Sequence, residues 1–331
     1  MQAILKGAPI LVAAFLAAVT LAQAATPVTM GVVPSFIEET TGAGIDSTFT
    51  GDWKYIVGGG VATFDCNADG FPDMLLAGGE HPAKFYLNQS PRGGALKFKE
   101  QPSGLELTQV VGAYPIDLDS AGIMDLVLLR SGESIAMHGL GGCKFERANE
   151  KWHFTGGDLW WTAFSATWEH GASWPTLAMG SYISITHSID IDPWGSCTGS
   201  VLMRPDAKGT GFGDAAALKP SFCPLSMLFT DWNRSGTPSL RVSNDREYYR
   251  GGSEQLFHLD PGQPPKPYTA DEGWKPLKIW GMGIASADVN GDGYPDYFLT
   301  SMADNKLQTL TNPPRSAERR VGTECRSRWS P

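Results

Sequence analysis

The sequence lacks the short patterns that carry most enzymatic chemistry. Its six histidines form no His-Glu-x-x-His pair, and no Gly-x-Ser-x-Gly pattern marks a nucleophilic serine. A glycine-rich stretch at 208–214 follows no strand-like segment and opens no helix, so it is not expected to hold a nucleotide. These absences favour a non-catalytic protein, although a glycosidase pair of carboxylates distant in sequence would leave no local pattern.

Basic residues are scarce. The chain has 26 Lys and Arg against 35 Asp and Glu, which gives a formal net charge of −9. Lys6 and the five arginines of residues 315–331 are part of this small basic complement, so the body between them is more acidic than the whole chain. An acidic body does not attract phosphate backbones, so nucleic acid is not an expected partner.

Long hydrophobic runs are confined to the first 24 residues, which we interpret as a secretory signal. Lys6 supplies the positive start, residues 10–21 the apolar core, and Ala22-Gln23-Ala24 a small-residue cleavage site. The apolar run is too short for a membrane span, which would argue against the alternative of a retained anchor. We therefore expect cleavage after Ala24, a secreted or periplasmic location and no stable membrane insertion of the mature chain.

The five cysteines include no Cys-x-x-Cys pair, so neither a zinc knuckle nor a redox pair is indicated. Export makes disulfides possible. Cys197 and Cys223 bracket a glycine-rich insertion and are the favoured pair. Cys66 and Cys143 could also pair, or could remain two free thiols, and Cys325 lies in the basic tail.

What the sequence does contain is a nine-residue frame with oxygen-bearing side chains on alternate residues. At 288–296 these occupy positions 1, 3, 5 and 9: Asp288, Asn290, Asp292 and Asp296. Gly293 allows a sharp bend, after which the carbonyl of Tyr294 can supply a further oxygen. Such a set suits Ca²⁺, although an acidic turn that binds nothing is the alternative. A calcium hand of the helix-loop-helix kind would need Glu where Leu299 stands, so this is a different loop.

The frame recurs. Frames begin at residues 65, 117, 168, 231 and 288. The first predicts a full ligand set, namely Asp65, Asn67, Asp69, the carbonyl of Phe71, and Asp73. The second predicts a weaker set, namely Asp117, Asp119 and Asp125, with Ala121 at position 5. The fourth is doubtful because Ser239 replaces the last carboxylate, and the third, with Trp168 at position 1 and Thr176 at position 9, should bind no metal.

Successive frames begin 51 to 63 residues apart. A repeat of that length fits one four-stranded blade of a propeller. The predicted fold class is all-β: a β-propeller of four-stranded blades with calcium-binding hairpin loops, spanning residues 25–312. From 313 to 331 we expect a basic tail without strands, disordered or foreign to the protein. The fifth blade would then stop after about two strands, and the propeller would be truncated at its C-terminal end, with residues 26–57 as a candidate closing strand.

Five tryptophans lie close together between residues 152 and 174: Trp152, Trp160, Trp161, Trp168 and Trp174. Exposed rings could form a platform for sugars. Packing between blades is the favoured interpretation, since a propeller needs bulky side chains there.

The loops resemble FG-GAP or VCBS repeats of integrin-α-like propellers. The opening, with Phe36-Ile-Glu-Glu-Thr, Ala43-Gly44-Ile45 and Gly58-Gly59-Gly60-Val61, resembles secreted homologues of cartilage acidic protein of the ASPIC/UnbV type. The resemblance implies calcium as the cofactor. It also implies a non-catalytic binding or adhesion scaffold with a protein or glycan ligand. The alternatives are a calcium-dependent hydrolase or lyase, and a structural repeat region fused to a missing C-terminal domain.

Overall fold

The computed structural model describes residues 34–186, 196–245, 252–311 and 315–320. The predicted signal segment and Cys325 lie outside the described residues. The chain divides into two compact units, Met1–Glu38 and Glu39–Pro331. Only five residues of the first unit are described, so all the elements below belong to the second.

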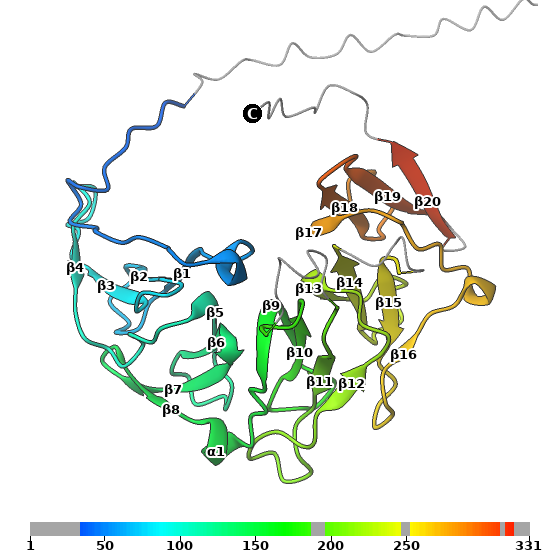
Figure 1. The fold of residues 1–331 in the computed structure, drawn as a ribbon, viewed down its shortest axis with the longest axis horizontal. Helices are drawn as coiled ribbons and strands as arrows, with labels where there is room; N and C mark the ends of the chain where they lie inside the picture. Colours follow the sequence, from blue (N-terminus) through cyan, green and yellow to red (C-terminus); the bar gives the residue numbers. More distant parts are fainter. Residues whose placement is uncertain (1–33, 187–195, 246–251, 312–314, 321–331) are drawn as a thin grey trace, which may run out of the picture. The chain divides into compact units, whose positions relative to one another are not determined.

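The second unit is built of antiparallel strands, which follow one another along the chain in five groups of four (Figure 1). Group 1 contains β1 (Val61–Phe64), β2 (Asp73–Leu76), β3 (Lys84–Asn88) and β4 (Phe98–Glu100). Group 2 contains β5 (Val110–Ile116), β6 (Asp125–Glu133), β7 (Ile135–Gly141) and β8 (Lys144–Arg147). Group 3 contains β9 (Asp158–Thr167), β10 (Thr176–Ser181), β11 (Ser200–Met203) and β12 (Ala216–Leu218).

The remaining two groups form separate sheets. Group 4 contains β13 (Pro224–Thr230), β14 (Ser239–Asn244), β15 (Gln255–His258) and β16 (Lys266–Pro267). Group 5 contains β17 (Gly281–Ala287), β18 (Asp296–Ser301), β19 (Lys306–Thr311) and β20 (Arg315–Arg320). Helical structure among the described residues is limited to single turns: η1 (Trp53–Tyr55), α1 (Asn149–Trp152) and η3 (Ala270–Glu272). The prediction of an all-β chain is confirmed.

Each predicted frame is the loop between the first and second strands of a group, and we number these loops 1 to 5 with their groups. The residue before position 1 pairs with position 9 in all five hairpins: Phe64 with Asp73, Ile116 with Asp125, Thr167 with Thr176, Thr230 with Ser239, and Ala287 with Asp296. A common register means a common loop length. The repeat is therefore a structural one, and it includes the third frame, from which most of the polar residues are absent.

Groups 2 and 3 share one eight-stranded sheet because β6 is nine residues long. Its first part pairs with β5 and β7, whereas its last residues, Ser131–Glu133, pair with Asp158–Trp160 at the start of β9. A single strand thus belongs to both groups.

The fifth group differs from the sequence-based expectation. The sequence predicts about two strands and no strand beyond residue 313, but β19 pairs antiparallel with β20 from Lys306–Arg320 to Thr311–Arg315. An edge strand requires backbone hydrogen bonds on one side only, and charged residues are common in such strands. Arginine-rich composition was therefore a poor reason to exclude a strand here.

The segment before β1 packs on group 1. Thr50 forms a parallel bridge with Gly79, the backbone N–H of Phe98 donates to the carbonyl of Ala43, and Tyr86 donates its hydroxyl to the carbonyl of Asp46. Further along the segment, the N–H of Gly59 donates to the carbonyl of Val111 in β5, and Trp53 packs edge-to-face on Trp160 of β9. The described contacts of this segment therefore place it against the first three groups.

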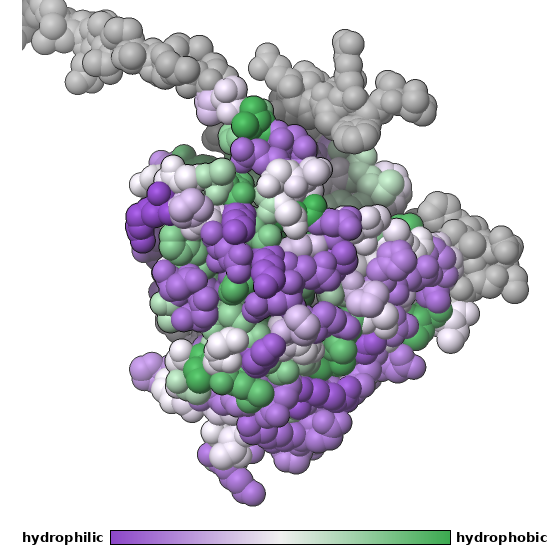
Figure 2. Space-filling model, turned by 90° about the vertical axis from the view of Figure 1, so that its left-hand side faces the viewer, coloured by the Kyte–Doolittle hydropathy of each residue, from purple (hydrophilic) through white to green (hydrophobic). Residues whose placement is uncertain are grey.

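The tryptophan cluster is core. Trp152, Trp160, Trp161 and Trp174 are each at most 5% exposed, which confirms the burial prediction for these four rings. Trp168, at position 1 of the third frame, is 47% exposed. The face drawn in Figure 2 is covered mainly by hydrophilic residues with scattered hydrophobic ones, as is usual for a folded chain.

Two disulfides staple the second unit. Cys197 is bonded to Cys223, with Cα atoms 4.9 Å apart, as the sequence favours. Cys66 is bonded to Cys143, also with Cα atoms 4.9 Å apart, so the structure has the paired form of the two alternatives left open. The second bond joins loop 1 to the turn between β7 and β8 and thereby ties group 1 to group 2.

Candidate metal-binding loops

Loops 1 and 5 fold in the same way through side chains that accept backbone N–H groups. In loop 5, the two carboxylate oxygens of Asp288 accept from the N–H groups of Asp292 (3.1 Å) and Gly293 (2.8 Å). Oδ1 of Asp292 then accepts from the N–H of Tyr294 at 2.9 Å. The carboxylate of position 1 thus curls the chain around itself, which brings the oxygens of positions 3 and 5 to the same side of the loop.

Loop 1 reproduces these bonds residue for residue. Asp65 accepts from the N–H groups of Asp69 (3.2 Å) and Gly70 (2.8 Å), and Asp69 accepts from the N–H of Phe71 at 2.8 Å. In both loops the asparagine of position 3 donates from its amide to the carboxylate of position 5. The amide of Asn67 or Asn290 would have to turn its oxygen inward to bind a cation.

Glycine at position 6 is required by the backbone. Gly70, Gly122, Gly236 and Gly293 have φ angles of +82°, +78°, +80° and +89°, in the region that favours glycine. The third frame has Ser173 at this position and lacks the same fold. The frames identified from sequence as loops 1, 2, 4 and 5 therefore share one conformation, and the third does not.

The aspartate at position 9 has a role that the sequence did not reveal. Asp73, Asp125 and Asp296 are at most 1% exposed. One oxygen accepts from the N–H of position 2 in the same loop, and the other accepts from an N–H on the third strand. These pairs are Cys66 and Asn88 for Asp73, Leu118 and Gly139 for Asp125, and Val289 and Leu310 for Asp296. The buried aspartate of position 9, at the start of the second strand, thus bonds to both the loop and the third strand.

Burial and charge act on these aspartates together. Loss of solvent is the main cause that raises the pKa of Asp73, and the charges of Asp69 and Asp65 raise it further, against the lowering effect of its two backbone hydrogen bonds. The pKa of Asp125 is also raised, chiefly by burial, with Asp119 adding to the effect. A divalent cation beside either carboxylate would favour its ionised form.

The backbone bonds of position 9 also limit how closely its carboxylate approaches those of positions 1 and 5. Among the described residues, two clusters bring three metal-type side chains within 4.8 Å of one another, and neither is the aspartate triad of loop 1 or loop 5. Both oxygens of position 9 point to backbone amides. The exposed oxygens available to a cation are therefore those of positions 1, 3 and 5 and the carbonyl of position 7. The carboxylate of position 9 lies on the buried side of the loop.

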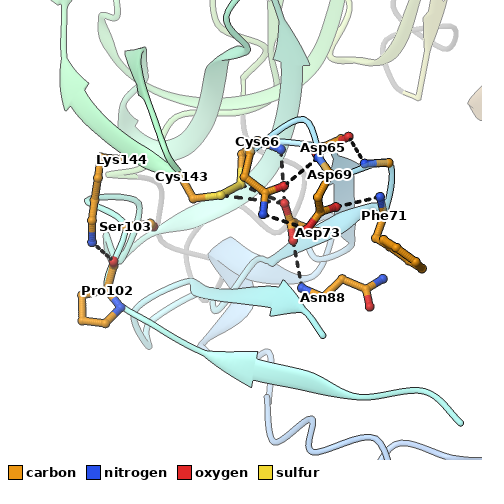
Figure 3. The surroundings of a disulfide bond; sticks show 12 residues. Asp65, Cys66, Asp69, Phe71, Asp73, Asn88, Pro102, Ser103, Cys143 and Lys144 are labelled. Carbon is orange, nitrogen blue, oxygen red and sulfur yellow. Dashed lines mark hydrogen bonds between the residues drawn. A yellow bond between two sulfur atoms is a disulfide. The ribbon is translucent and has the colours of Figure 1, made fainter. Parts of the chain in front are cut away.

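One of the two clusters is the disulfide of loop 1 (Figure 3). Sγ of Cys66 lies 2.8 Å from Oδ2 of Asp73, and Sγ of Cys143 lies 3.9 Å from it. A disulfide sulfur carries no proton to donate and is not a thiolate ligand. The two sulfur atoms therefore pack against the buried carboxylate of Asp73 and do not add a ligand to loop 1.

The other cluster lies in loop 2 and contains a histidine that the frame did not include. Nδ1 of His138, on β7, lies 3.2 Å from Oδ1 of Asp125 and 3.8 Å from Oδ2 of Asp119. Asp117 and Asp119 otherwise accept from the loop amides as in loop 1. An imidazole suits transition metals better than Ca²⁺, so loop 2 has a different ligand chemistry from loops 1 and 5.

Loops 3 and 4 keep the hairpin with fewer oxygens. In loop 4, Asp231 accepts from the N–H groups of Ser235 and Gly236, both at 2.8 Å, but position 9 is Ser239. In loop 3 the hydroxyl of Thr176 donates to Glu169 at 2.7 Å, which replaces the carboxylate tie. Neither loop offers the full set.

A match to a family model covers residues 65–128, which correspond to an FG-GAP-like repeat. This stretch contains loops 1 and 2. A search of curated proteins finds no match. Among the described residues, no helix is long and apolar enough to cross a membrane.

Solved structures with propeller-like folds resemble the chain at low identity. One is BBS1N, crystallised in complex with ARL6DN, at 11% identity and a TM-score of 0.46, with 79% of this chain and 68% of that chain covered. Another is an Agrocybe aegerita lectin described as recognising non-reducing terminal N-acetylglucosamine, at 12% identity and a TM-score of 0.43, with 82% and 68% covered. Likeness at this level concerns the fold alone.

Proposed function

We propose that the protein is an exported, calcium-binding β-propeller that acts as a non-catalytic binding or adhesion scaffold. The observation that carries the proposal is the identical folding of loops 1 and 5, in which Asp, Asn and Asp occupy positions 1, 3 and 5 and a carbonyl follows at position 7. The family match across residues 65–128 supports a propeller scaffold. The loops give calcium a structural task.

The structural role of calcium follows from the negative charge of these loops. Three aspartates and an asparagine crowd each of these loops, and their carboxylates repel one another where no cation neutralises them. All-oxygen sets of this kind take Ca²⁺, and extracellular modules commonly bind it with dissociation constants of about 10⁻⁴–10⁻³ M. Bound calcium would therefore stiffen the hairpin loops of groups 1 and 5.

Thermal unfolding with calcium and with EDTA tests the proposal. Chelation should lower the melting temperature of the wild-type protein, and Asp292→Ala should remove much of that difference. Asp304→Ala is the matched control, because it deletes one exposed aspartate from the same group outside the frame. Equal melting temperatures with calcium and EDTA in the wild type would refute a structural role for the ion, as would an equal calcium response in the Asp292 and Asp304 variants.

Export is supported by the two disulfides, because such bonds persist mainly in oxidising compartments. The proposal predicts a mature protein that begins at Ala25, and the intact mass of the protein recovered from the medium or periplasm checks it. Recovery of an unprocessed chain with reduced cysteines from the cytoplasm would contradict it.

The relation to the ASPIC/UnbV type is part of the proposal and rests on the opening segments around residues 36–61. Sequencing the transcript beyond codon 331 tests it, because proteins of that type carry a further C-terminal domain. A transcript that continues without such a domain would argue against this closer relation while leaving the calcium proposal intact.

A further inference from the structure

A pocket lies between groups 4 and 5, beside the fourth and fifth frames, where Trp232 and Tyr297 line its wall. It is a small, largely apolar cleft that opens to solvent. Arg241 of β14 and Gln308 of β19 contribute polar groups to it, and its other walls include the rings of Trp232, Tyr268, Trp274 and Tyr297. An apolar cleft with a few convergent polar groups is the usual form of a small-molecule site.

The polar group at the base of this pocket is unsatisfied. Arg241 is 3% exposed, yet its Nε–H has no hydrogen-bond partner among the described residues. Its terminal nitrogen donates to Oε1 of Gln308, and its guanidinium stacks 4.5 Å from the ring centre of Tyr297 and 5.4 Å from that of Trp274. Buried donors are almost always paired, so the free Nε–H indicates a missing acceptor.

The charge of Arg241 is unsatisfied as well. The acidic side chain with the largest electrostatic effect on it is Glu254, which is 1% exposed and forms no ion pair with it. Burial raises the pKa of Glu254 to about 8, so this side chain is mostly neutral at pH 7. Burial lowers the pKa of Arg241 to about 10, which still leaves it charged. The pocket is therefore lined by a buried arginine that forms no ion pair among the described residues.

The acid at the mouth does not supply the missing charge. Glu272 accepts from the N–H and hydroxyl of Thr269 and lies 2.8 Å from Nε2 of His258. His258 in turn stacks on Tyr268, with ring centres 3.4 Å apart. These contacts hold the carboxylate of Glu272 at the rim and fix the aromatic wall behind it.

We propose that this pocket binds a small acid in which a carboxylate is attached to a ring. The carboxylate accepts from the guanidinium of Arg241, and the ring lies between the aromatic walls, of which Trp274 is one. Arginine and a carboxylate form charge-assisted hydrogen bonds, and aromatic faces pack equally well on a sugar ring or an aryl ring. A uronic acid and an aryl acid share this chemistry. The inference goes beyond the calcium scaffold and does not depend on bound calcium.

Ligand-observed NMR titrations test the proposal with two matched pairs of probes. Glucuronate is compared with glucose, and benzoate with benzyl alcohol, each with calcium and with EDTA. We expect an acid of at least one pair to bind and its neutral counterpart to bind about tenfold more weakly or not at all, because a hydrogen bond to a charged group is lost. The acid that binds more tightly identifies the ring as sugar or aryl.

Two variants and two controls locate the site. Arg241→Gln should weaken binding of the acid about tenfold or more, and so should Trp274→Leu, which alters a half-buried wall and carries the test if the first variant does not fold. Arg147→Gln and Trp168→Leu make the same changes on exposed side chains of groups 2 and 3 and should leave binding unchanged. Failure of both acids to bind, equal binding of acid and neutral probe, or full affinity in the folded site variants would overturn the proposal.

Discussion

Replacing Glu254 by glutamine should remove a pH dependence of folding stability that the wild-type protein shows between about pH 4.5 and 8. Burial raises the pKa of this carboxyl from 4.5 to about 8 in the folded chain. Between these values the folded state keeps a proton that the unfolded state has released. Stability from this group is therefore fully present below pH 4.5 and is lost as the pH rises through about 8.

The magnitude follows from the width of that window. Each pH unit across which one extra proton is held changes the free energy of unfolding by about 1.4 kcal/mol, so the loss from pH 4.5 to 8 is at most about 5 kcal/mol. Hydrogen bonds limit the effect, because Oε1 of Glu254 accepts from the N–H of Asn244 at 2.9 Å in either protonation state. Glutamine keeps that acceptor and resembles the uncharged acid. The variant should therefore be as stable as the wild type at low pH and more stable than the wild type above pH 8.

Denaturant unfolding of both proteins at about pH 5, 6, 7 and 8 provides the measurement. The informative quantity is the difference in free energy of unfolding between the wild type and Glu254→Gln, because the buried aspartates of the loops titrate in both and cancel. The difference should fall steadily by a few kcal/mol across the series. A difference that is constant with pH, or that rises, would refute the claim that burial holds this carboxyl neutral.

Three further substitutions test the framework of the second unit by denaturant unfolding. Replacing both Cys66 and Cys143 by alanine should cost about 4–5 kcal/mol in the chain-entropy model, since the bond closes a loop of 77 residues, and a loss below about 1 kcal/mol would contradict that account. Asp296→Ala leaves one buried and one partly buried N–H group without their acceptor and should cost about 2–5 kcal/mol even in EDTA; a variant as stable as the wild type in EDTA would show that the carboxylate of position 9 does not hold the loop and third strand together. Gly104→Ala should cost at least about 1–3 kcal/mol, because φ is +99° and a Cβ would overlap the carbonyl oxygen of Phe145; a loss under about 0.5 kcal/mol would contradict the steric conflict.

The hairpins were predictable because their information is local. A carboxylate at position 1, a glycine at position 6 and β-compatible flanks lie within about twelve residues, and each acts on its neighbours through the backbone. Even the third frame, which lacks the oxygens, was placed correctly from its start at Trp168. Its register, Thr167 opposite Thr176, matches that of the other four.

What could not be predicted depends on groups that are distant in sequence. The backbone hydrogen bonds of the aspartate at position 9 could not be predicted, because its second partner, such as the N–H of Asn88 or Leu310, is 15 or 14 residues away. The contact of His138 with Asp125 of loop 2 could not be predicted either, because His138 lies on another strand, 13 residues further along the chain. The pocket of Arg241 combines residues from two groups, and no single stretch of sequence carries a signal for it.

The long strand β6 has a mechanical consequence. Because Ser131–Glu133 continue the ladder into β9, groups 2 and 3 cannot separate without breaking backbone bonds inside a strand that both need. The junction from group 3 to group 4 is bridged by the Cys197–Cys223 disulfide, whereas the junction from group 4 to group 5 has neither a shared strand nor a disulfide among the described residues. Fluctuations that open the molecule should therefore begin between groups 4 and 5, and amide exchange along β6 should be among the slowest in the chain.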